Sequence, residues 1–294
     1  MDSIKKKKSQ DYLYKLFIYV ALISLAIVIL IPVGWVFLAS IKQNSEFYGN
    51  PWTLPQGFRW ENFQRAFVNA RMGEYFFNSV IVTVMALVIL LVVALPASYC
   101  IARFNFKGRK FINSLIMAGL FINVNYIVVP IFLMLNDADR FMKASMGFRF
   151  LLNNRFILAL VYAATALPFT IYLLSGYFKS LPKAYEEAAQ IDGCGYFKTM
   201  TKIMIPMARP SIITVILFNF LAFWNEYIIA LTLMPGGDWT LPVGLQNLMA
   251  VQKQATNYGQ MYAGLVIVML PTLILYILVQ KKLTQGMSLG GLKD

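Results

Sequence analysis

The sequence predicts an all-α polytopic membrane protein with six transmembrane helices. Of its 294 residues, 59% are hydrophobic and only 13% are charged, whereas soluble domains usually carry about a quarter charged residues. The sparse charges leave six long apolar stretches, one of them interrupted by a single glutamate, and each exceeds the roughly 20 residues that a spanning helix needs. These stretches are continuous rather than alternating, which argues against a β-barrel. The predicted spans are residues 16–41, 75–102, 111–136, 156–178, 210–234 and 258–280.

Lysine and arginine concentrate in the segments at one end of these spans, before the first, between the second and third, and at 179–209. Because these residues resist translocation, we expect that end to be cytoplasmic, with both termini inside. The net charge of +13 then reflects topology in a lipid bilayer and requires no nucleic acid.

The predicted organisation is a basic cytoplasmic N-terminus at 1–15, a transmembrane domain at 16–283 and a cytoplasmic tail at 284–294. The connecting external segments are 42–74, 137–155 and 235–258. A multi-pass protein of a bacterial inner or cytoplasmic membrane is the expected localisation.

No catalytic or metal site is expected on this chain. It has no histidine, the commonest general base and metal ligand, and the spans hold no paired carboxylates. A phosphate-binding loop requires G-x-x-x-x-G-K-[ST]. In the nearest candidate, Gly193–Thr199, Phe197 occupies the position of the second glycine. We therefore expect neither a cofactor nor ATP hydrolysis on this chain.

The segment at 180–209 is too long for a tight connection and is rich in helix-forming residues. Pro182 suits a first helical turn, and Glu186 and Glu187 suit the positive end of the helix dipole. Gly193 follows where a left-handed residue would end the helix. A second helix is expected from about Tyr196 to Met204, ended by Pro206, with Pro210 opening the fifth span.

This segment resembles the EAA loop of binding-protein-dependent ABC importer permeases. Glu187-Ala188-Ala189, three residues, Gly193, nine residues and Ile203-Met204-Ile205-Pro206 follow that family's spacing, with Ile205 replacing its usual leucine. With Asp192 before Gly193, the segment is similar to those of the carbohydrate-transporting branch of the family. The alternative is an ordinary helix on the membrane surface.

Further similarities extend along most of the chain. They are Ala102-Arg103-Phe104 with Phe106 and Gly108, Trp224-Asn225-Glu226-Tyr227, Thr240–Leu245 and the Gly-rich tail Gln285–Lys293. Together they resemble the second, six-span permease subunit of the maltose-type importers.

The resemblance implies a type I ABC importer fold in which the EAA segment is a coupling helix between the fourth and fifth spans. It implies these partners: a second homologous permease subunit, two cytoplasmic ABC ATPase subunits that bind ATP and Mg, and an extracytoplasmic solute-binding protein. A sugar or oligosaccharide is the expected substrate, with a polyol or sugar phosphate as alternatives. An ion-coupled secondary transporter is the alternative from another class. The implied ATPase-coupling residues are Glu187, Ala188, Ala189, Asp192, Gly193, Phe197, Ile203 and Pro206.

Two polar clusters lie within the predicted spans, where ionisable and amide side chains usually contact a cavity or a neighbouring helix. Glu226 either lines a sugar pathway with Trp224, Asn225 and Tyr227 or bonds to neighbouring helices. The second cluster, in the third span, has the same two interpretations. It consists of Asn123, Asn125 and Tyr126.

Overall fold

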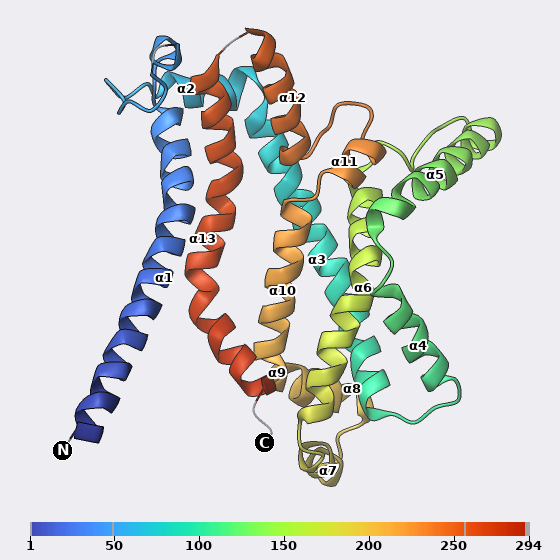
Figure 1. The fold of residues 1–294 in the computed structure, drawn as a ribbon. Coiled ribbons are helices and arrows are strands. Elements are labelled where there is room, and N and C mark those ends of the chain that lie inside the picture. The colour runs from blue at the N-terminus through green and yellow to red at the C-terminus, as the bar shows by residue number, and fades with distance from the viewer. Residues whose placement is uncertain (1, 49, 256, 292–294) are drawn as a thin grey trace. The chain divides into compact units, whose positions relative to one another are not determined.

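The structure is a computed structural model that describes residues 2–48, 50–255 and 257–291, and every regular element in those ranges is a helix (Figure 1). These residues form two compact units. One contains the chain up to Ala70 and Asn247–Ile267, and the other contains Arg71–Gln246 and the chain from Val268.

Four helices are long and apolar enough to cross a membrane, and two bent helix pairs bring the number to six if each pair is one span. The long helices are α1 (Asp2–Ser40), α3 (Met72–Arg103), α6 (Arg155–Ser180) and α13 (Tyr258–Gly291). The structure therefore supports four to six spans, and a count of six requires that each bent pair is one span. The predicted tail is helical as far as Gly291, and residues 292–294 lie outside the described residues.

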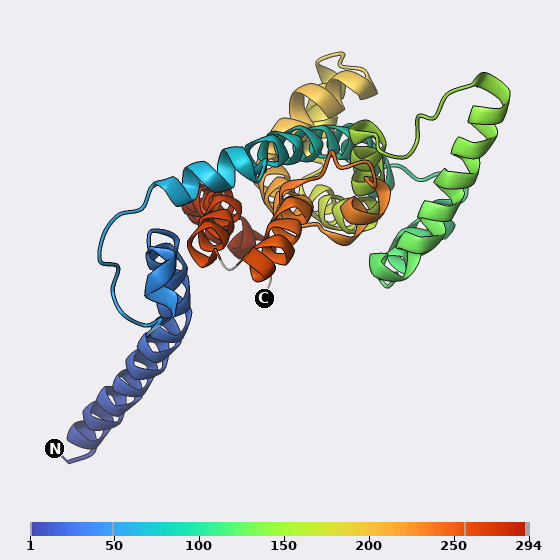
Figure 2. The same cartoon turned by 90° about the horizontal axis from the view of Figure 1, so that it is seen from above.

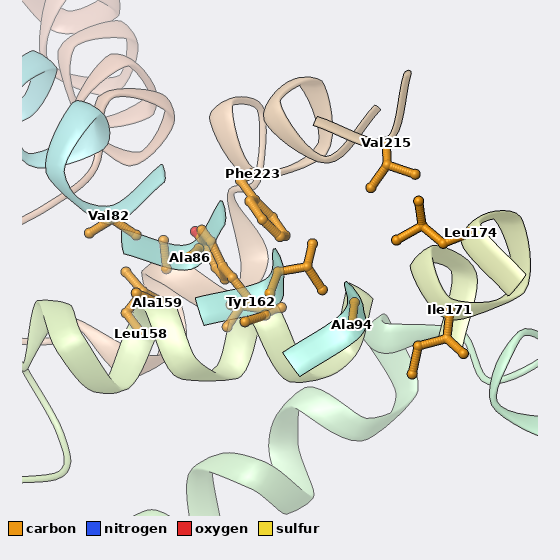
Figure 3. Close-up of a cluster of buried hydrophobic side chains, with 14 of the residues drawn as sticks. Val82, Ala86, Ala94, Leu158, Ala159, Tyr162, Ile171, Leu174, Val215 and Phe223 are labelled. Carbon is orange, nitrogen blue, oxygen red and sulfur yellow. The ribbon is translucent and has the colours of Figure 1, made fainter. Parts of the chain in front are cut away.

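The packing of α3 against α6 forms the core of the second unit (Figure 3). Buried residues recur every three or four positions along one face of α3, and all but Leu90 are small: Ser79, Thr83, Ala86, Leu90, Ala94 and Ser98. That spacing places them on a single face. Small residues let transmembrane helices approach closely, which matters because lipid tails provide no hydrophobic force between helices.

α6 contributes the complementary face of this core, and α10 (Arg209–Trp224) covers part of it. Ala159 and Ala163 lie one turn apart on α6 and are almost fully buried. Tyr162 stacks on Phe223 of α10 with ring centroids 5.5 Å apart. Figure 3 shows Ala159, Tyr162 and Phe223 among the side chains between the three helices.

The third predicted span is not one straight helix, which corrects the expected range 111–136. α4 (Arg109–Gly119) and α5 (Val124–Met146) meet at 103°. Gly119 ends α4 against Pro168 of α6, whose ring would lie 2.8 Å from a Cβ at that position. Asn123 then caps α5, its side chain accepting a bond from the Asn125 N–H. α5 projects away from α3 and α6 in both views (Figure 2).

Two predicted helix ends were wrong. The fifth span, expected at 210–234, stops at Trp224 and is followed by a separate short helix, α11 (Ile228–Leu233). The third span, expected to end at 136, continues in α5 to Met146. A further helix, α12 (Leu241–Ala255), lies in the segment 235–258. Pro210 does lie in the first turn of α10, as predicted.

In the first unit, the segment after α1 folds around Lys42, whose side chain is fully buried. Its ammonium donates to the Pro51 carbonyl at 2.7 Å and lies 4.3 Å from the Trp35 ring centroid. The Asn62 amide donates to the carbonyls of Ser40 and Lys42. Asn62 belongs to α2, and the short helices of this segment are η1 (Asn44–Phe47), α2 (Glu61–Gln64) and the π-helical turn η2 (Arg65–Asn69).

Asp139 on α5 fixes the loop that follows this helix. Its carboxylate is buried and accepts hydrogen bonds from the backbone N–H groups of Phe150, Leu151 and Leu152 at 2.8–2.9 Å. Asp137, two residues earlier, is 72% exposed and makes only a 4.0 Å ion pair with Arg140.

We expect Asp139→Ala to speed amide hydrogen exchange at residues 150–152 by at least about tenfold, since hydrogen bonds to a charged group contribute about 1.5–3 kcal/mol each. Asp137→Ala is the matched control and should leave these amides unchanged. Equal protection in both variants would show that the carboxylate does not hold the loop.

Candidate functional site

The candidate site is the segment between α6 and α10, which folds as two short helices joined at a glycine. α7 (Ala184–Ile191) precedes the turn, and α8 (Tyr196–Thr199) follows it. Gly193 has φ +74°, and the N–H groups of Gly193 and Cys194 bond to the carbonyls of Gln190 and Ala189. This paired pattern is a Schellman cap, which favours glycine at the left-handed position. The predicted end of the first helix is confirmed.

The second helix is longer than predicted, because it passes through Pro206 instead of ending there. α8 continues as a π-helical turn, η3 (Met200–Met204), and then as α9 (Ile205–Met207). Pro206 lies in the first turn of α9, where its missing N–H is tolerated. Ile203 packs against the hydrophobic core, and Met204 is fully buried. These residues attach the segment to the spans.

One side of the segment is exposed and combines apolar and acidic residues. Ile191, Phe197 and Tyr196 are 86%, 75% and 70% exposed. The neighbouring residues Glu187, Ala188, Asp192 and Gly193 are also exposed. Ala189, in contrast, is only 2% exposed and packs within the chain itself. Of the two adjacent alanines, only Ala188 is therefore open to a partner.

Glu186 attaches α7 to the end of α3, a role that the sequence did not reveal. Its carboxylate accepts a hydrogen bond from the Tyr99 hydroxyl at 2.8 Å and forms an ion pair with Arg103 Nε at 3.5 Å. The side chains of Arg103 and Glu186 are 7% and 15% exposed. Arg103 also donates to the Leu181 carbonyl at 2.7 Å. A single arginine therefore connects both the start of the segment and α7 to a span.

A small cavity of about 120 Å³ adjoins this ion pair. Tyr99, Arg103, Glu186 and Gln190 line it, together with Tyr196 and Thr199 of α8. The two short helices and the end of α3 thus share one polar pocket. Glu187, one residue after Glu186, makes no ion pair with any side chain that the structure describes.

Glu226 has a fully defined set of partners inside the protein. Its carboxylate accepts a hydrogen bond from the Tyr162 hydroxyl at 2.8 Å. It also accepts hydrogen bonds from the backbone N–H groups of Ile229 and Ala230 at 2.7 and 3.0 Å. It thereby caps α11 and links α6 to the break after α10. This geometry favours the interpretation in which Glu226 bonds to neighbouring helices over the one in which it lines a pathway.

The residues around Glu226 divide between the interior and the surface. Trp224 is 2% exposed, and its indole N–H donates to the Val268 carbonyl at 3.2 Å. Tyr227 packs against the hydrophobic core. Asn225 alone of this group is exposed, with its amide bonded back to the Leu221 carbonyl.

The second polar cluster lies at the break between α4 and α5. Asn123, Asn125 and Tyr126 are exposed, Tyr126 at 81%. α4 has 11 residues, a rise of about 16 Å at 1.5 Å per residue, which is roughly half of a bilayer's hydrocarbon core. α4 alone is therefore too short to cross a bilayer, and the break interrupts the α4–α5 pair. Within the described part of the chain, no three Cys, Asp or Glu side chains are grouped to hold a metal ion.

Residues 92–289 match the family described as the binding-protein-dependent transport system inner membrane component. The chain belongs to this family. Its members are transport components, so this permease is a transport subunit and not an enzyme.

Full-length relatives agree with this assignment. The permease is 35% identical to the diacetylchitobiose uptake system permease protein NgcG of Streptomyces coelicolor, over 96% of this chain and 90% of that one. It is 30% identical to the multiple sugar-binding transport system permease protein MsmG of Streptococcus mutans, over 99% and 100% of the two chains.

The fold is that of a solved importer. A chain of a bacterial ABC transporter involved in the import of the acidic polysaccharide alginate superimposes with a TM-score of 0.76 at 24% identity, covering 92% of this permease and 97% of that chain. The type I importer fold expected from the EAA segment is confirmed.

We expect Glu186→Ala to loosen α7 and Glu187→Ala to leave it in place, because only Glu186 is bonded to α3. Losing a largely buried ion pair and its hydrogen bond costs about 2–3 kcal/mol. Amide exchange across residues 184–191 should then be at least about tenfold faster in the Glu186 variant.

A double-mutant cycle with Arg103→Ala provides the internal check. Because the two side chains act as a pair, the double variant should be little worse than either single one. Additive effects would show that Arg103 and Glu186 act separately.

Proposed function

We propose that this permease is one of two membrane-spanning subunits of an ATP-driven importer of sugars or oligosaccharides. The relatives named above are uptake permeases for diacetylchitobiose and for multiple sugars, which supports a carbohydrate substrate. A complex of the alginate transporter with a periplasmic protein bound to an alginate pentasaccharide supports a solute-binding protein as partner. A second, homologous permease subunit completes the translocation pathway.

The observation that carries the mechanism is the exposed side of the segment around Gly193. It presents apolar side chains and carboxylates to the outside while Ala189, Met204 and Glu186 tie it to the spans. A buried apolar centre with polar groups around it is typical of a protein interface. We propose that this side docks on a cytoplasmic ATPase, two copies of which bind ATP and Mg.

The bonds of Glu186 explain how such docking would move the spans. A displacement of α7 acts directly on Arg103 and Tyr99, which lie in the last turns of α3. Because α3 and α6 share a close-packed core, both helices would respond together. With the α7 end in the cytoplasm, ATPase closure would be converted into alternating access at the other end.

The break in the third span is the proposed sugar pathway. Non-helical backbone at membrane depth is tolerated only where it is buried in protein or lines a water-filled cavity. Asn123, Asn125 and Tyr126 are exposed there and offer amide, hydroxyl and aromatic groups that suit a polyhydroxylated ligand. Among the residues near Glu226, Asn225 remains the exposed candidate.

We expect Glu187→Lys and Gly193→Trp to abolish both sugar uptake and co-purification of the ATPase subunit, while the permease still inserts. Glu187→Lys inverts a charge on the docking side, and Gly193→Trp adds bulk where φ is +74°. Glu61→Lys, an acid-to-base change at another exposed glutamate, is the matched control. Uptake that survives both changes would remove the coupling role of this segment.

We expect Asn125→Leu and Tyr126→Leu to raise the half-saturating sugar concentration for uptake by about tenfold, the usual effect of losing one or two hydrogen bonds to a ligand. Val129→Leu, at an exposed apolar position one turn along α5, should have no effect. ATPase co-purification should be normal in all three variants. An unchanged half-saturating concentration would place the sugar pathway elsewhere.

A further inference from the structure

A cavity beside the turn between α3 and α4 lies apart from the Gly193 segment. Its volume is about 620 Å³, within the range of small-molecule sites, about 300–1,000 Å³. Asn105, Arg109, Lys110 and Asn113 line it from the turn and from α4, and Lys179 lines it from the end of α6. Phe106 and Phe111 complete its rim.

The cavity is strongly cationic, with three basic side chains and no carboxylate in its lining. Among the described side chains, neither Lys110 nor Lys179 has an ion-pair partner. Arg109 is held in position by hydrogen bonds to the Asn105 side chain and the Ala102 carbonyl. The guanidinium is thus fixed while the two ammonium groups remain available for an anion.

The start of α4 adds to this positive potential. Gly108 precedes the helix and has no side chain to cap it, and no acidic residue occurs in the first turn. Arg109 and Lys110 therefore lie at the positive end of the helix dipole, where negative groups are normally favoured. The local arrangement is unfavourable until a negative charge neutralises it.

An apolar surface leads away from the cavity along α4. Phe111 is 68% exposed, Leu115 is 55% exposed and Ile112 is 40% exposed. Phe111 and Leu115 are one turn apart and lie on the same side of the helix. α4 and α5 form one of the two bent pairs that are apolar enough to cross a membrane as one span. In such a span the apolar surface of α4 would contact acyl chains, and the basic residues at its start would lie nearer the headgroups.

We propose that this cavity binds an anionic phospholipid such as phosphatidylglycerol. The phosphate contacts Arg109, Lys110 and Lys179, the two asparagine amides donate to the headgroup oxygens, and the acyl chains follow Phe111 and Leu115. Basic pockets between transmembrane helices at the membrane edge recognise anionic headgroups in this manner. The site does not depend on the proposed coupling role or on which side of the membrane it occupies.

The test is retention of lipid by the purified full-length permease, together with any subunits that co-purify, measured by native mass spectrometry. Phosphatidylglycerol and phosphatidylcholine are offered at equal concentrations in mixed micelles. We expect the wild type to retain phosphatidylglycerol preferentially. Each basic residue near an anionic headgroup contributes roughly fivefold in affinity, so Lys110→Gln with Lys179→Gln should weaken retention by about 25-fold.

Two variants separate loss of the site from loss of folding. Lys110→Arg with Lys179→Arg keeps the charge and should retain phosphatidylglycerol, and Lys143→Gln removes an exposed lysine on α5 without effect. Equal retention of the two lipids, or unchanged retention in the double glutamine variant, would overturn the proposal.

Two other outcomes would assign the cavity to a different ligand and would also overturn the proposal. Displacement of the lipid by millimolar inorganic phosphate would identify a site for free phosphate. Loss of a co-purifying ATPase subunit in the double glutamine variant, with lipid retention unchanged, would identify a protein contact.

Discussion

The close contact between α3 and α6 is the constraint on which the rest of the second unit depends. In a bilayer, helices gain little from burying apolar surface, and association rests on how closely their backbones can approach. The alanines, serines and threonine along α3 permit this approach over most of its length. Glu186 is bonded to Tyr99 in the last turns of α3, and Glu226 is bonded to Tyr162 of α6. Both glutamates are therefore attached to the α3–α6 pair.

The polar residues inside the spans include some that are hydrogen-bonded in the interior and some that are exposed. An unpaired polar group in a low-dielectric interior is costly, and the partly buried Glu226 carboxylate and the buried Asn219 amide both have partners. Glu226 accepts three hydrogen bonds, and the buried Asn219 amide donates to Thr170 and to the Val215 carbonyl. Asn123, Asn125 and Tyr126 are the contrast, because they stay exposed at the break of the third span. That difference separates structural polar residues from candidates for substrate contact.

Much of the fold and part of the site followed from the sequence alone. Charge-free stretches located the spans, and Asp192-Gly193 located the end of α7, because both signals are local. The breaks at 120–123 and 225–227 were missed, since they arise from tertiary contacts such as Gly119 against Pro168 and Glu226 with Tyr162. Glu186 was missed for the same reason. Adjacent glutamates look alike in sequence, and only the position of Arg103 shows which one is bonded.

The interrupted third span has a mechanical consequence. A continuous helix changes direction only by sacrificing some of its internal hydrogen bonds, whereas α4 and α5 each already end at their own cap. The four residues between them therefore act as a joint, about which the angle can change at low energetic cost. Motion of the unit would then concentrate at this hinge, leaving the α3–α6 pair to move as one body.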